Sequence, residues 1–138
     1  MASLIYNSAI DDMARNNIDF DTNTFKAMLV TSTYTPNKDT HDKRDDVTNE
    51  VSGTGYTAGG VASAVTVTKD TANDKVTIQF GAVSWASSTI TARGCVYYKS
   101  RSGASSADEL VCYADFGSDV SSSGGTFSVA ASTITLQN

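Results

Sequence analysis

The only histidine, His41, lies in the most densely charged stretch of the chain, and a histidine is the side chain best suited to act as a general base near neutral pH. Serine and aspartate are abundant, so the residue types of a Ser-His-Asp hydrolase are present. The sequence contains no Gly-x-Ser-x-Gly elbow, however, which is the turn that exposes the nucleophilic serine in one large class of hydrolases. We therefore expect no enzymatic activity and assign no catalytic residue.

Acidic side chains surround His41 and could supply oxygen ligands to a hard cation. An EF-hand loop would need acids at alternate positions, a central glycine and a closing glutamate, and this stretch lacks that pattern. Mixed charges at such short spacings usually pair locally. We expect a solvated, self-paired loop that holds neither metal nor cofactor. The acids are Asp39, Asp42, Asp45, Asp46 and Glu50.

Two further motifs have a chemical and a structural interpretation. The glycine-rich segment 51–60 is followed by neither a lysine nor a helix, so it predicts a turn between strands rather than a phosphate-binding loop. Cys95 and Cys112 lie on two predicted neighbouring strands. A disulfide requires Cα atoms within about 7 Å, which a register with Cys95 opposite Cys112 would allow. Two buried free thiols are the alternative, and zinc is not expected because the metal-ligand spacings are missing.

The segments that would position these residues are mostly strands. Alternation of apolar and polar residues over 61–68 and 75–80 predicts a hairpin with one buried face. Ser/Gly-rich segments separate the other strands, and 100–109 reads as a mobile surface loop. We expect an all-β domain spanning 1–138, an antiparallel sandwich or jelly roll of about seven strands. A short helix and arm occupy 1–23 and the sandwich 24–138. The strands are expected at 24–31, 61–68, 75–80, 89–99, 110–116, 126–130 and 133–137, and the helix at 4–16.

Composition excludes several kinds of partner. The 138 residues carry a net charge of −5 and form no basic stripe, so nucleic-acid binding is not expected. The longest strongly apolar run is about four residues, far below the roughly 20 of a membrane-spanning helix. The first residues resemble no secretory signal, which predicts a protein made in a cytoplasm.

Several side chains are of types that are common at protein interfaces. The irregular segment 33–60 is longer than the core of a small domain needs, so we expect it to contact a partner. Arg93 and Tyr97 share a predicted strand face and form a second candidate surface. Trp85 is expected to cap the core, with its indole N–H donating to a backbone carbonyl, and sugar stacking is the alternative. The candidate partner-binding residues are Tyr34, His41, Arg44, Tyr56, Arg93 and Tyr97.

Taken together, five segments resemble a family of small virion proteins of tailed bacteriophages. The resemblance extends from Tyr6 to Leu136. Cys95 and Cys112 occupy positions where small residues are expected in that family, which favours packing roles for both thiols. The family carries no catalytic residues. The segments are Asn37–His41, Glu50–Gly60, Trp85, Thr89–Gly94 and Asp115–Val120.

The resemblance implies a capsid decoration, or cement, protein on the outer surface of the phage head. Its partners would be the major capsid protein and further copies of itself, as a homo-oligomer made in the bacterial cytoplasm and located in the virion. Mild acidity agrees with the outside of the shell, because the inside faces DNA. A tail tube or tip subunit is one alternative. A carbohydrate-binding module that meets a host surface through Trp85 is another.

Overall fold

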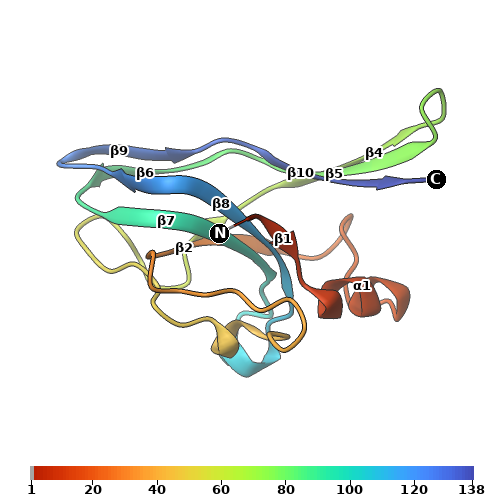
Figure 1. The fold of residues 1–138 in the computed structure, drawn as a ribbon, viewed down its shortest axis with the longest axis horizontal. Coiled ribbons are helices and arrows are strands. Elements are labelled where there is room, and N and C mark those ends of the chain that lie inside the picture. Colours follow the sequence, from red (N-terminus) through yellow and green to blue (C-terminus); the bar gives the residue numbers. More distant parts are fainter. Residues whose placement is uncertain (1) are drawn as a thin grey trace.

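The computed structural model describes residues 2–138 and confirms the all-β prediction, with one short N-terminal helix (Figure 1). The sheets are antiparallel throughout, and the described residues form ten strands rather than about seven. The helix is α1 (Asn7–Ala14). The strands are β1 (Leu4–Ile5), β2 (Phe25–Val30), β3 (Val61–Ala62), β4 (Val65–Asp70), β5 (Lys75–Phe80), β6 (Val83–Ser88), β7 (Thr91–Lys99), β8 (Leu110–Ser121), β9 (Gly125–Val129) and β10 (Ser132–Gln137).

A five-stranded main sheet has the order β1-β8-β7-β2-β3, and the pair β6-β9 lies over one of its faces (Figure 1). The layer between them is the larger core, in which the rings of Phe80 and Tyr97 pack with centroids 4.5 Å apart. A second apolar cluster covers the opposite face of the main sheet and includes Tyr6, Tyr34 and Tyr98. Two covered faces explain why β2 is almost wholly buried, as its continuous apolar run predicts.

The glycine-rich segment packs against β2. Gly60 has a φ of +76°, and a Cβ at this position would lie 1.8 Å from the carbonyl oxygen of Ala27. Only glycine permits both the backbone conformation and this approach. The side chain of Glu50 accepts hydrogen bonds from the Tyr56 hydroxyl and the Gly59 N–H, at 2.7 and 2.6 Å. The predicted turn is therefore fixed against its own sheet, where it fills the space at the edge of β2.

Several strand boundaries differ from the prediction. The expected strand 61–68 is divided, because Ser63 donates its backbone N–H to Phe25 in the main sheet and the chain then leaves for another sheet. The segment around Trp85 forms the unpredicted strand β6. Strand β8 extends to Ser121, through part of a segment expected to be a turn. The N-terminal arm also supplies β1, which pairs with β8.

The three strands β10, β5 and β4 form a separate sheet, which we call the projecting sheet. Figure 1 shows that its β4–β5 turn and the end of β10 extend beyond the body, on the side where α1 lies. The hairpin of β4 and β5 was predicted from sequence and is present. Its exposure is greater than expected: Val67, assigned to the buried face, is 40 % exposed.

Candidate functional site

Two of the six candidate partner-binding side chains are buried within the chain. Tyr34 is 2 % exposed and Tyr97 is 0 % exposed, so neither presents a contact surface in this conformation. Tyr97 lies in the larger core, where its hydroxyl is 3.1 Å from the Ser132 hydroxyl. Both rings are packing groups in the structure, because large aromatic side chains gain more from core packing than from exposure.

Tyr34 connects Tyr6 to His41 in a short chain of hydrogen bonds. The Tyr6 and Tyr34 hydroxyl oxygens are 2.8 Å apart, and the Tyr34 oxygen lies 3.0 Å from His41 Nδ1. Because the Asn37 N–H also donates to Nδ1, that nitrogen is an acceptor and the Tyr34 hydroxyl donates to it. The Tyr6 hydroxyl therefore donates to the Tyr34 oxygen. Burial and this donated hydrogen bond raise the pKa of Tyr6 well above its usual range. His41 thus holds the 33–47 segment onto the second apolar cluster.

The remaining three candidates, Tyr56, Arg44 and Arg93, also have partners within the chain. The hydroxyl of Tyr56 donates to Glu50 and accepts the N–H of Leu29. The guanidinium of Arg44 lies 5.1 Å from the centre of the Tyr98 ring and pairs with Asp108. Arg93 pairs with Asp119 at 2.9 Å on the surface. Segment 33–60 is therefore built into the domain, and its candidate anchors mainly hold it in place.

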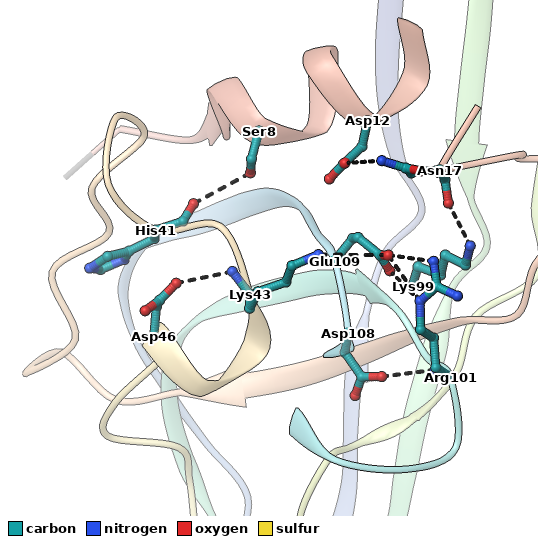
Figure 2. Close-up of polar contacts among 10 residues, drawn as sticks. All are labelled: Ser8, Asp12, Asn17, His41, Lys43, Asp46, Lys99, Arg101, Asp108 and Glu109. Carbon is teal, nitrogen blue, oxygen red and sulfur yellow. Dashed lines mark hydrogen bonds and ion pairs between the residues drawn. The ribbon is translucent and has the colours of Figure 1, made fainter. Parts of the chain in front are cut away.

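The most buried charges of the described residues are Asp108 and Glu109, at 1 % and 3 % exposed. Asp108 accepts from Arg44 Nε at 2.7 Å and from the Arg101 backbone N–H at 2.8 Å. Glu109 accepts from Arg101 Nη2 at 2.6 Å, and Lys43 Nζ lies 3.7 Å away (Figure 2). We call these five residues the ionic cluster. Of the segment 100–109, predicted to be a mobile surface loop, residues 101–104 are exposed, whereas its end at Asp108 and Glu109 is buried and held by charges from Lys43 and Arg44.

The pH dependence of stability should report on Glu109. Burial acts to raise its pKa, but hydrogen bonds from Arg101 and the charge of Lys43 bring the pKa below its ordinary value. A folded-state pKa below the unfolded value of about 4.3 means that ionised Glu109 stabilises the fold above that pH. This stabilisation is lost as the pH falls through the folded-state pKa.

We therefore expect Glu109→Gln to flatten the fall in the free energy of unfolding between about pH 5 and pH 2. Urea titrations at several pH values in that range measure the slope. Asp119→Asn, in the exposed pair with Arg93, is the matched control and should leave most of the slope unchanged. Equal slopes in the wild type and Glu109→Gln would contradict the role assigned to Glu109.

The two cysteines are free and buried. Cys95 lies opposite Ala114, and Cys112 lies opposite Tyr97, so the register that would place the cysteines opposite each other is wrong by two residues. Burial raises the pKa of the Cys95 thiol to about 12, and it also raises the pKa of Cys112. Thiols of this kind are unreactive packing groups.

Trp85 is in the core, as predicted, and is 4 % exposed. Its ring packs on Phe127 and Tyr56, with centroids 6.1 and 5.7 Å away. Its Nε1 has no hydrogen-bond partner among the described residues, so the prediction that it donates to a carbonyl is wrong. A sugar ring cannot stack on so deeply buried an indole, and the carbohydrate-binding role suggested for Trp85 is not available in this conformation.

The projecting sheet exposes two large apolar side chains near its free end, although Ile78, Phe80 and Ile134 of the same sheet belong to the larger core. Val67 and Leu136 are 40 % and 46 % exposed on the same sheet face. This face borders a groove of about 450 Å³, with α1 and the 16–21 arm on the other side. Sequence alternation placed Val67 on the buried face of a hairpin. Alternation shows that a strand has two unlike faces, but it does not show what covers each face.

The described residues contain no group of three or more His, Cys, Asp or Glu side chains placed to hold a metal ion. Within the same residues, none of the hydrogen bonds joins His41 to a serine hydroxyl or a cysteine thiol; Ser8 Oγ donates instead to the His41 carbonyl, at 3.5 Å. No helix of this part of the chain is both long and apolar enough to cross a membrane. No family model, curated protein or solved structure matches the chain.

Proposed function

We propose that this protein is a virion structural protein of a tailed bacteriophage, and specifically a capsid decoration protein that binds the outer surface of the assembled head. The sequence resemblance described above supports the proposal over nearly the whole chain. The net charge of −5 favours the outer surface of a shell whose interior faces DNA. Its partners are then the major capsid protein and further copies of itself.

The projecting sheet is the structural observation that carries this proposal. The larger core lies between the main sheet and β6, β9 and the adjoining ends of β5 and β10, whereas β4 has no buried side chain on either face. The part of the sheet that extends beyond the body adds surface that is available for contact. Its exposed valine and leucine are side chains that a protein partner would cover.

Cryo-electron microscopy of the virion tests the location directly. Density for this fold on the outside of the shell, between neighbouring coat subunits, is the expected result. Density confined to the tail would reject the decoration role and favour a tail tube or tip subunit. Absence of the chain from purified virions would reject both structural roles.

A binding measurement tests whether the projecting sheet makes the contact. Purified capsids that lack this protein are incubated with the wild type or with Val67→Asp, and the bound fraction is measured by sedimentation. We expect Val67→Asp to weaken binding about tenfold or more, because contact would bury an unpaired carboxylate.

Val120→Asp is the matched control, since Val120 is 41 % exposed on β8, outside the projecting sheet. This variant should bind like the wild type. Circular dichroism establishes that both variants are folded. Equal binding by Val67→Asp and the wild type would place the coat contact elsewhere on the domain.

A further inference from the structure

Strand β10 forms one edge of the projecting sheet, and its hydrogen-bond register shows which of its groups remain free. The Asn138 N–H donates to the Asp74 carbonyl, and β10 pairs with β5 in unbroken register from Ser132 to Gln137. In an antiparallel ladder only every second residue bonds to a given neighbour. The even-numbered residues of β10 therefore bond to β5, and Thr133, Thr135 and Gln137 direct their backbone N–H and C=O groups to the open edge.

The hydrogen bonds between β5 and β4, on the other side of β5, agree with this alternation. The Gly81 N–H donates to the Ala64 carbonyl, which continues the β4–β5 register of Val65 opposite Phe80. The odd-numbered residues of β5 therefore bond to β4, and the even-numbered ones to β10. Two separate hydrogen bonds, Asn138 N–H to Asp74 and Gly81 N–H to Ala64, therefore identify the same open groups on β10.

The open edge of β10 is accessible. Thr133 and Thr135 line a groove of about 520 Å³, together with residues of β1 and β8. None of the side chains that line this groove is charged. Exposed edges in soluble proteins are usually protected by charged residues, proline or bulges. Strand β10 has none of these, whereas β4 carries Lys69 and β6 has a register shift.

The strand is also complementary to itself. If two copies pair antiparallel about Thr135, then Thr135 faces Thr135, and Thr133 faces Gln137 of the other copy. The open groups then form about six backbone hydrogen bonds, two for each bonded pair. On the other face, Leu136 lies opposite Ile134 of the second copy, at the close spacing of a non-bonded pair. Leu136 is 46 % exposed in the single chain, and this contact would cover it.

We propose that β10 pairs with β10 of a second copy of this chain, which joins two projecting sheets into one continuous six-stranded sheet. The contact is isologous and closes on itself, so it produces a dimer. The inference deepens the proposed function, because it assigns the self-association of the decoration protein to a specific edge. Self-association is measured on purified protein without capsids, so its outcome is independent of the capsid-binding result.

Sedimentation equilibrium over a range of protein concentrations tests the proposal. The wild type should approach twice the monomer mass as concentration rises. Thr135→Lys places two like charges opposite each other, and Thr135→Pro removes an open-edge N–H without breaking a bond to β5. Each variant should raise the dimer Kd at least about tenfold and remain folded by circular dichroism.

Lys69→Pro is the matched control, because Lys69 lies on the open edge of β4 and its N–H also faces away from β5. This variant should dimerise like the wild type. Thr135→Cys should form a cross-link between copies with a short bifunctional maleimide, whereas Lys69→Cys should not. A monomeric wild type, a trimer, or unchanged association of Thr135→Lys would overturn the proposal.

Discussion

Replacing Trp85 with alanine should lower the free energy of unfolding by about 3–5 kcal/mol, the usual cost of removing a large aromatic side chain from a core. Trp85 is 4 % exposed and contacts rings from two other segments, Tyr56 and Phe127. The cavity would therefore lie between the glycine-rich segment, β6 and β9. Urea unfolding followed by circular dichroism measures the loss.

Trp85→Phe is the informative control for this substitution. It keeps an aromatic ring and removes an indole N–H that has no hydrogen-bond partner among the described residues. The expected cost is below about 1.5 kcal/mol, because the smaller ring loses packing while an unsatisfied donor is also removed. If Trp85→Ala kept its melting temperature and lost binding to a glycan, Trp85 would instead be a sugar-stacking residue, and the core assignment would be wrong.

Asp108→Ala should cost about 3 kcal/mol, near the lower end of the range for breaking a buried ion pair. The substitution leaves Arg44 without its carboxylate and the Arg101 N–H without its acceptor. Arg44 retains 22 % side-chain exposure, so water would solvate part of its charge and limit the cost. Equilibrium denaturation at neutral pH provides the measurement.

Asp119→Ala removes an aspartate from an ion pair of similar length but in an exposed position. Exposed pairs usually contribute less than about 1 kcal/mol, so the difference between the two variants isolates the effect of burial. Similar losses in both variants would show that the ionic cluster stabilises the domain no more than a surface pair does.

Strands that stay in one sheet and keep the same environment along each face were predictable from sequence. Alternation over 75–80 corresponds to β5, and the unbroken apolar run over 27–30 corresponds to the part of β2 with both faces covered. The division between β3 and β4 was not predictable, because Val61 and Val65 fit the same alternation. What separates them is the hydrogen bond from Ser63 to Phe25, and the approach of such a distant strand leaves no local signal.

The candidate site was less predictable than the fold. Segment 33–60 was identified by its length and charge. These features indicate an ordered segment, but they do not show which distant residues hold it in place. Arg44 and Asp108 are 64 residues apart in sequence, and nothing local relates them. The projecting sheet was recognised only as a hairpin, since exposure of its apolar face depends on where the other layer ends.

The order β1-β8-β7-β2-β3 of the main sheet also constrains how the chain is assembled during synthesis. Strand β1 is synthesised before every other described strand, but among the described residues its ladder partner is β8, which begins at Leu110. Strand β2 pairs with only two residues of β3 and, along its whole length, with β7, which ends at Lys99. The β4–β5 hairpin, by contrast, joins neighbouring segments and can close within microseconds of its synthesis. Within the projecting sheet, only the β4–β5 pair therefore forms locally, while β10 and the main sheet are completed after β10 and β8 have been translated.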